Sequence, residues 1–317
     1  MSINARTIAV LWRERRNAQR FYVRHKWSTI PATIIARMLS YRVVSEVDDV
    51  PYGKGYAGEI SRGTDYFKRA MTMLMGRISH GVVAGTGEAK ELLTSQFRIP
   101  PGRVGVVPIG VDVNYFRPLD REQAISRVGL DPCHRYVLFM GSFASWVDFD
   151  SLLGAFSLAA RDHPEVRLLL VGDGAERPHI EATVARLGID DAVIFTGYVR
   201  ERERVRDFLG AATVLLASHR GEHLNRIGMN ATKIAEYLAA GRPIVAKDVA
   251  RLRAMIDETG AGIVVSGGAE SMAEAIAEVL EPGRAEEMGH TGRRLAEEQY
   301  SWEATVARTL PLFGETQ

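Results

Sequence analysis

Two charged residues three positions apart, Lys233 and Glu236, open an otherwise apolar stretch that reads TKIAEYLAAGRPIVAKD. Its apolar spacing predicts a helix with one buried stripe, and Gly241 followed by Pro243 predicts where that helix ends. Residues three apart share a helix face, and unpaired backbone N–H groups collect in the first turn. A basic side chain beside such a helix start suits a phosphate group. An exposed ion pair, worth about 0.3–0.5 kcal/mol, is the alternative that these residues alone leave open.

The composition limits the class of protein. A chain of 317 residues suggests two domains of ordinary size. No apolar run approaches the roughly 18–20 residues of a membrane-spanning helix, and no signal peptide is recognisable. The single cysteine, Cys133, excludes an internal disulfide and an all-cysteine metal site. We therefore expect a cytoplasmic protein.

Basic residues gather in residues 1–42, which carry a net charge of +8, whereas the remainder of the chain carries −7. Aromatic and aliphatic residues are interleaved with them: Leu11, Trp12, Phe21, Tyr22 and Trp27. This combination is typical of a segment that lies on an anionic membrane surface. A solvated helix face that meets acidic groups elsewhere is an equal alternative. Nucleic acid fits less well, because the rest of the chain is acidic and shows no binding motif.

The second half of the chain alternates short apolar strands with amphipathic helices. We expect strands near 135–140, 166–171, 192–196, 212–217, 243–246 and 261–265. This alternation predicts an α/β fold with a mostly parallel, doubly wound sheet. Ligands of such sheets bind beyond the carboxyl ends of the strands. Glycines at four predicted strand ends fit tight turns or close backbone approach there: Gly141, Gly172, Gly174 and Gly197.

The first half resembles a shorter version of the same pattern. Strands are expected near 20–24, 41–46, 81–84 and 103–108, and the stretch TIAVLWRERRNAQR over 7–20 predicts one basic helix. Residues 108–120 hold two prolines and no period, so they are interpreted as a connector. Two facing sheet domains would leave a cleft, the usual place for a small-molecule site.

Six separated motifs occur in an order that is informative as a set. They are GVDVNYFRP at 110–118, VLFMGSF at 137–143, LLLVGDGAER at 168–177, VIFTGYV at 193–199, TKIAEYLAAGRPIVA at 232–246 and YSWEATVARTL at 300–310. Together they closely resemble the group 1 (family 4) glycosyltransferases over about residues 20 to 310. The resemblance implies the GT-B architecture of two facing Rossmann-like domains.

This resemblance also implies a division of labour. Residues 1–118 would form a shortened acceptor-side domain, 119–298 the donor domain, and 299–317 a helix crossing back to the first domain. The implied reaction moves a sugar from a nucleotide-diphospho-sugar to a glycan or lipid-linked acceptor, with retention of configuration. No metal and no other cofactor are expected.

Particular residues match the donor site of the family. Glu236 matches the glutamate that bonds the nucleotide ribose, and a carboxylate can accept two hydrogen bonds from a diol. The other implied donor-binding positions are Gly141 and Ser142 beside the diphosphate, Tyr198 and Val199 along the base, and Thr232, Lys233 and Ile234 at the helix start. Lys233 would also stabilise the charge that grows on the departing diphosphate, and is therefore a catalytic candidate.

Two departures from the family pattern concern the diphosphate. The family commonly has an arginine and a lysine after the first donor strand, where this chain has Ser142 and Val147. The loss of two cations is expected to weaken stabilisation of the leaving group by several kcal/mol unless other residues substitute. The candidates are Lys233, Arg220 and Arg226.

The amino-terminal part departs further. Nothing in residues 1–19 resembles the glycine-rich loop with which typical members begin, so the acceptor domain is expected to lack its opening units. Many relatives have a histidine near the reacting sugar, and Asp48 in EVDD is the nearest match and the second catalytic candidate. His25, which follows FYVR, is a further candidate near the site.

Four other interpretations compete. A degenerate, catalytically weak glycosyltransferase-like binding or scaffolding protein is the main alternative. A sugar-nucleotide 2-epimerase would need carboxylates and histidines that we do not identify. A dehydrogenase is disfavoured because no strand is followed by G-x-G-x-x-G. The HRGEH stretch at 219–223 fits a zinc-peptidase pattern, but Gly221 interrupts the helix that this chemistry requires.

Overall fold

The computed structural model describes residues 3–48, 50–51, 54–55, 58–59, 61–220, 232–249 and 252–314. Its contacts group the chain into two compact units. The first holds the residues up to 109 and those from 303 onward, and the second holds 110–222 and 231–302. The domain limits at 118/119 and 298/299 stay predictions, since the contact-based grouping changes at 109/110 and 302/303.

The second unit is built on a six-stranded parallel sheet in the order β12-β11-β10-β7-β8-β9. Its strands are β7 (Arg135–Met140), β8 (Val166–Val171), β9 (Val193–Gly197), β10 (Val214–Ala217), β11 (Ile244–Lys247) and β12 (Gly262–Val265). The chain moves outward from β7 to β9, returns to β10 and then moves the other way. The carboxyl ends of β7 and β10, which are neighbours, therefore form the point where the strand order reverses.

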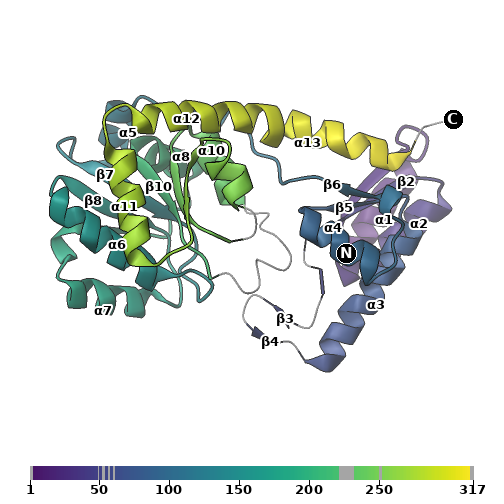
Figure 1. The fold of residues 1–317 in the computed structure, drawn as a ribbon. Coiled ribbons are helices and arrows are strands. Elements are labelled where there is room, and N and C mark those ends of the chain that lie inside the picture. Colours follow the sequence, from purple (N-terminus) through teal and green to yellow (C-terminus); the bar gives the residue numbers. More distant parts are fainter. Residues whose placement is uncertain are drawn as a thin grey trace. The chain divides into compact units, whose positions relative to one another are not determined.

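Helices cover both faces of this sheet (Figure 1). They are α5 (Arg121–Val128), α6 (Phe149–Asp162), α7 (Arg177–Leu187), α8 (Arg202–Ala211), α10 (Thr232–Ala239), α11 (Ala269–Leu280) and α12 (Arg284–Leu295). On one face α6 packs against α7 and α11, and on the other α5 packs against α8 and α10 against α12. The strands are apolar and buried on both sides, as a sheet covered by helices on both faces requires.

The first unit contains a four-stranded parallel sheet in the order β1-β2-β5-β6. Its strands are β1 (Arg20–Arg24), β2 (Arg42–Val47), β5 (Gly81–Ala84) and β6 (Val104–Val106). Its helices are α1 (Ile3–Glu14), α2 (Ile30–Met38), α3 (Arg62–Ile78) and α4 (Gly87–Ser95). Successive strand residues alternate between faces, so Val43 joins the core under α1 to α3 while Val44 points to the opposite face.

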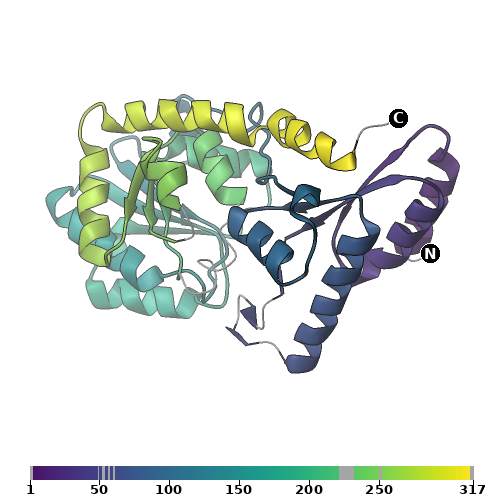
Figure 2. The same ribbon diagram turned by 45° about the vertical axis from the view of Figure 1, so that its right-hand side comes forward.

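The end of the chain covers that opposite face (Figure 2). After α13 (Trp302–Thr309), the short helix η6 (Leu310–Phe313) places Phe313 against Val44 and Val83. Gly81 and Gly105 leave room for it, because a Cβ on either would come within 2.3 or 2.7 Å of Leu312 atoms. Residues separated by more than 200 positions thus complete one core.

All ten main strands lie close to the predicted segments, whereas two local predictions need correction. The predicted basic helix over 7–20 is wrong in its extent, because α1 ends at Glu14. The amides of Asn17 and Ala18 both donate to the Glu14 carbonyl at 2.8 Å, which turns the chain so that Arg20 can begin β1. The small antiparallel pair β3 (Lys54–Gly55) and β4 (Gly58–Glu59) was not predicted.

Candidate functional site

Three glycine turns meet at the carboxyl ends of β7, β8 and β9. The Gly141 amide donates to the Val171 carbonyl at 2.9 Å, and the Gly172 amide donates to the Gly197 carbonyl at 3.1 Å. Gly141 and Gly172 have φ angles of 148° and 141°, which L side chains rarely adopt. A Cβ at Gly172 would lie 2.0 Å from the Gly141 carbonyl oxygen. Only glycine fits there, so the turns approach one another as backbone against backbone.

A cavity of about 250 Å³ opens beside these turns. Val171 and Val205 give it apolar walls, and backbone of the turns forms the rest. Four residues that the sequence assigned to donor binding line it together with Asp173 and Gly172: Gly141, Ser142, Tyr198 and Val199. The Tyr198 side chain is 74% exposed, so it lies at the mouth of the cavity.

Helix α10 is fastened to the end of β7 by a buried tyrosine. The Tyr237 hydroxyl accepts a hydrogen bond from the Met140 amide at 2.9 Å, and its ring is fully buried. Burial raises the pKa of Tyr237, so the phenol stays neutral. Ile234 is only 1% exposed and belongs to the buried side of α10, whereas Thr232 at the helix start is exposed.

This attachment brings the Lys233 ammonium to the first glycine turn. A Cβ added at Gly141 would lie 2.8 Å from Lys233 Nζ, which sits 4.7 Å from the centre of the Phe139 ring. The structure therefore excludes the alternative of an exposed Lys233–Glu236 ion pair. Burial lowers the pKa of Lys233 to about 8, and the nearby Glu236 charge opposes that shift. The Glu236 charge therefore offsets only part of the desolvation of the ammonium, and a bound anion would offset the rest.

Glu236 lies one turn further along the same helix. Burial raises its pKa, while the positive charges of Arg202 and Lys233 act in the opposite direction. Arg202 itself stacks over the rings of Tyr115 and Phe116, at 5.0 and 5.6 Å. Among the described residues no cation lies within ion-pair distance of the Glu236 carboxylate. Its oxygens are thus available to a hydroxyl-bearing ligand.

The segment after β10 contributes a histidine that the sequence interpretation did not assign to the donor site. His219 is 4% exposed, and its Nδ1 has no partner among the residues that the structure describes. Burial, and secondly the Lys233 charge, lower the pKa of His219 to about 3, so the ring is neutral near pH 7. The only sequence signal was its place at a strand end, because HRGEH directs attention to zinc.

The predicted substitute cations are not all at the turn. Arg220 is exposed, and its guanidinium lies 3.5 Å from the Asp150 carboxylate. Arg226 lies outside the described residues. Val147, the position matched to a family lysine, is a core residue with 2% exposure. Next to it Asp148 accepts from the Lys247 ammonium, so that second cation at this edge is already neutralised.

Asp148 illustrates how such a pair is stabilised. Burial alone would raise the pKa of Asp148, but hydrogen bonds from Lys247 and from the side chain and amide of Ser151 outweigh burial and lower it. Asp148 is also the N-cap of α6, where a carboxylate meets free N–H groups. Lys247 therefore supports the fold, whereas Lys233 faces the turn.

The acceptor-side candidate Asp48 belongs to the first unit, at the carboxyl end of β2. It pairs with the Arg24 guanidinium from the end of β1. Glu46 lies beside it, and burial and then the Asp48 charge raise the pKa of Glu46. His25, the other predicted candidate, has its pKa lowered by burial and contacts Thr72 at 3.4 Å.

The described residues contain no group of three or more His, Cys, Asp or Glu side chains that could hold a metal ion. His219 is the only member of the HRGEH stretch apart from Arg220 that lies within them. They also contain no helix long and apolar enough to cross a membrane.

Comparison with known proteins identifies the family of the domain that carries these residues. Residues 134–282, which span β7 to α11, match the model of the family described as glycosyl transferases group 1. The match contains the glycine turns, the cavity and α10. Residues 134–282 are a group 1 glycosyl transferase domain.

Relatives of this glycosyl transferase domain extend the match. A D-inositol 3-phosphate glycosyltransferase of Segniliparus rotundus is 32% identical over 72% of this chain and 50% of its own length. Another from Thermobispora bispora is 30% identical over 75% of this chain and 56% of the relative. The chain thus spans about half the length of the curated relatives it matches.

Solved structures of lower sequence identity share the fold of this chain. Anabaena HepE in complex with UDP covers 96% of this chain with a TM-score of 0.75, at 16% identity and 81% of the HepE chain. A glycosyltransferase from Rickettsia africae covers 98% of this chain and 79% of its own, with a TM-score of 0.73 and 18% identity. The fold is α/β with parallel sheets, the GT-B architecture predicted from the motifs.

Proposed function

We propose that this chain is a glycosyltransferase that uses a nucleotide-diphospho-sugar and transfers the sugar with retention of configuration to a glycan or lipid-linked acceptor. The observation that carries the proposal is the half-buried Lys233 ammonium, which lies against the Gly141 turn of a group 1 glycosyl transferase domain and has no ion-pair partner among the described residues. The named relatives are glycosyltransferases, and HepE was solved with UDP. A uridine diphospho-sugar is accordingly the first donor to test.

The proposed chemistry follows from where charge develops. As the bond to the sugar breaks, negative charge grows on the departing diphosphate. Lys233 and the backbone amide of Ser142 would receive that charge beside Gly141, and Glu236 would hold the ribose diol. Tyr198 and Val199 would lie along the base. Because these donors are fixed before the substrate arrives, little reorganisation is needed in the transition state. No metal or other cofactor enters this scheme.

Asp48 is proposed to act on the acceptor. Its carboxylate can accept a hydrogen bond from a hydroxyl group, and the ion pair with Arg24 holds that carboxylate in place. Arg220 is proposed as a secondary cation, which would have to leave Asp150 to reach a diphosphate.

The first test is thermal unfolding of the purified chain with UDP, GDP, ADP and CMP in turn. A nucleotide at about 100 times its Kd stabilises the folded state by about 2.7 kcal/mol. We expect a rise of several degrees in the midpoint with one nucleoside diphosphate and no rise with CMP. Loss of that rise in Glu236→Ala would support the assigned site. No rise with any of the four would count against a working donor site and favour a degenerate binding protein.

We also propose peripheral binding to an anionic membrane from the cytoplasm. Trp12 on α1 and Trp27 are 58% and 70% exposed, amid the basic residues of 1–42. Exposed aromatic rings among cations suit a headgroup layer. Sedimentation with liposomes that contain phosphatidylserine should fall when Arg13, Arg15 and Arg16 are all changed to Gln. Unchanged sedimentation would contradict the proposal.

A further inference from the structure

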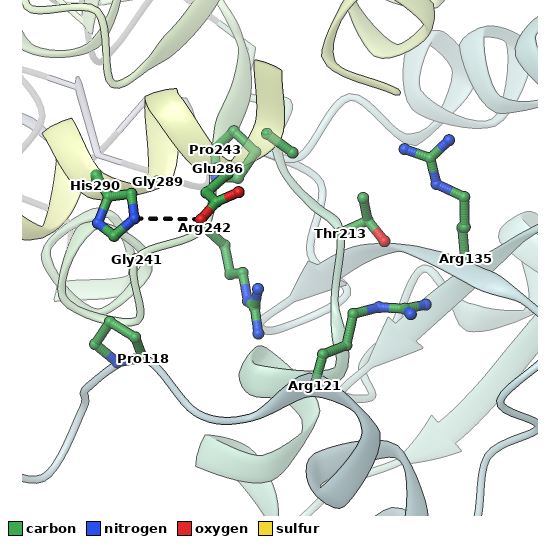
Figure 3. A pocket seen from close by; sticks show the side chains of 11 residues that line it. Pro118, Arg121, Arg135, Thr213, Gly241, Arg242, Pro243, Glu286, Gly289 and His290 are labelled. Atoms are coloured by element: carbon green, nitrogen blue, oxygen red, sulfur yellow. Dashed lines mark ion pairs between the residues drawn. The ribbon is translucent and has the colours of Figure 1, made fainter. Parts of the chain in front are cut away.

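A second, larger cavity lies at the opposite edge of the six-stranded sheet. Its volume is about 500 Å³, and three of its lining residues stand where strands begin (Figure 3). Arg135 is the first residue of β7, and Thr213 and Pro243 directly precede β10 and β11. Ligands of doubly wound sheets bind at the carboxyl edge, so the family fold does not account for this cavity.

Three arginines line it from different elements, namely Arg121 from α5, Arg135 from β7 and Arg242 from the turn after α10, and Figure 3 shows their guanidinium groups pointing in different directions. Burial, and then the charge of Arg135, lower the pKa of Arg121. Burial, and then the charge of Arg121, lower the pKa of Arg242. The three guanidinium groups therefore repel one another in a partly desolvated place. No described carboxylate pairs with Arg121 or Arg242, and Glu165 only reaches Arg135 at 4.0 Å.

Each guanidinium is nevertheless held in place. Arg121 donates to the His134 carbonyl at 2.7 Å, and Arg135 donates to the Leu280 carbonyl at 2.7 Å. Arg242 donates to the carbonyls of Leu119 and Gly210. A guanidinium has five N–H donors, so each keeps donors beyond these contacts. Fixed orientation reduces the conformational entropy that a ligand must offset on binding.

Unsatisfied polar atoms surround the same cavity. Arg121 Nε, Arg242 Nε and Thr213 Oγ1 are buried and have no hydrogen-bond partner within the described ranges. Such atoms are costly unless a ligand or ion compensates them. The lining has one carboxylate, Glu286, which is exposed at the rim and lies 3.6 Å from His290 (Figure 3).

We propose that this arginine pocket (Arg121, Arg135, Thr213 and Arg242) binds the phosphate group of a small phosphorylated molecule. Planar guanidinium groups recognise phosphate oxygens through paired N–H donors, and a threonine hydroxyl adds a neutral donor. The volume admits more than a phosphate alone, so the ligand carries a further group of sugar size. This site is separate from the donor site and does not rest on the proposed transfer reaction.

The test is isothermal titration of the full chain with inorganic pyrophosphate, at an ionic strength held constant with potassium chloride. Arg121→Gln should weaken binding by about tenfold, since a charge-assisted hydrogen bond contributes that much. Arg135→Gln serves as a second variant, because its side chain is about one-third exposed and its loss disturbs the fold less. Thermal unfolding checks that each variant is folded.

Two controls identify the place of binding. Arg284→Gln removes the same charge from a guanidinium already held by Glu278 and Glu287, and should change affinity by less than about threefold. Lys233→Met disables the donor site and should leave pyrophosphate binding at the arginine pocket unchanged. The proposal is overturned if pyrophosphate does not bind above the chloride background, if both arginine variants keep the wild-type affinity, or if only Lys233→Met loses binding.

Discussion

The carboxyl edges of the two parallel sheets are equipped in opposite ways. In the second unit, glycine turns leave a cavity, and the half-buried Lys233 ammonium beside Gly141 has no ion-pair partner within the part of the chain that the structure describes. In the first unit, the corresponding edge carries Arg24 and Asp48, which already pair with each other. The first arrangement is costly until an anion arrives, whereas the second is satisfied by itself and suits a neutral hydroxyl ligand.

Because of this difference, substitutions at the two edges should affect stability and ligand affinity differently. A desolvated charge without a partner lowers the free energy of unfolding but strengthens binding of an anion. Its removal should therefore raise stability and weaken nucleotide binding. An exposed ion pair contributes about 0–1 kcal/mol, so its removal should alter stability little. The following predictions test this contrast, from the largest expected effect to the smallest.

The largest effect is expected for Lys233→Met, with Lys247→Met as the matched variant at the same edge. Lys233→Met should weaken UDP binding by about a hundredfold, as loss of a charge-assisted contact to phosphate implies. It should also raise the free energy of unfolding by about 1–3 kcal/mol, because burial no longer penalises a charge. Lys247→Met should leave UDP affinity unchanged and lower the free energy of unfolding, since it removes the ion-pair partner of Asp148. Calorimetry with UDP and thermal unfolding measure both, and equal UDP affinities would contradict the contrast.

Glu236→Gln should weaken UDP binding by about tenfold, because a carboxylate is a stronger acceptor than an amide for the ribose diol. The sharper measurement compares UDP with its 2′-deoxy analogue in both proteins. Wild type should prefer UDP, and the variant should bind the two almost equally. A preserved preference in Glu236→Gln would place the ribose elsewhere.

UDP affinity should fall by about tenfold between pH 7 and pH 9, because Lys233 with a pKa of about 8 loses its proton there. The effect on stability has the opposite sign. The folded pKa lies below the unfolded value of about 10.4, so the unfolded state binds more protons between these values and Lys233 makes stability rise with pH. Both slopes should vanish in Lys233→Met, and a persistent affinity slope would assign the titration to another group.

His219 should govern part of the acid limit of stability. Its folded pKa of about 3 lies below the unfolded value of about 6.5, so the unfolded state binds more protons between them. The contribution of the neutral ring is full above pH 6.5 and is lost as pH falls, by up to about 1.4 kcal/mol per pH unit. Denaturant titrations from pH 7 to pH 4.5 should show a shallower decline in His219→Gln. An unchanged decline would contradict this.

The smallest effects on binding and stability are expected for Asp48→Asn. The pair with Arg24 is partly exposed, so the free energy of unfolding should change by less than about 1 kcal/mol. UDP affinity should stay the same, whereas sugar transfer should fall several-fold if Asp48 orients the acceptor. A change in UDP affinity would remove the distinction between the two edges.

Much of the fold was predictable because local signals agreed. Apolar runs such as LLLV at 168–171, followed by glycine, predict a buried strand and its turn, and both are present. The pair β3–β4 was missed because two-residue strands have no period, and the early end of α1 depends on turn contacts rather than on helix propensity.

The site was predictable only where a motif held its residues together. Lys233 and Glu236 belong to one predicted helix, and Gly141 directly follows the apolar run that predicts β7. The role of Tyr237 in attaching α10 to the end of β7 could not be predicted, because it depends on a hydrogen bond with Met140 that only the folded structure reveals. The arginine pocket joins residues that are far apart in sequence, so no spacing could reveal it.

The hydrogen-bonded glycine turns have a consequence for the heat-capacity change of ligand binding. The hydrogen bonds from Gly141, Gly172 and Phe143 to neighbouring turns fix these walls of the cavity in the folded protein. Ordering of side chains costs about 0.5–1.5 kcal/mol for each one immobilised, and along these walls that cost falls mainly on Tyr198. The backbone of these turns already loses its conformational entropy when the chain folds, so ligand binding does not have to order it. Nucleotide binding here should thus show the small heat-capacity change of a preformed surface rather than the large one of coupled folding.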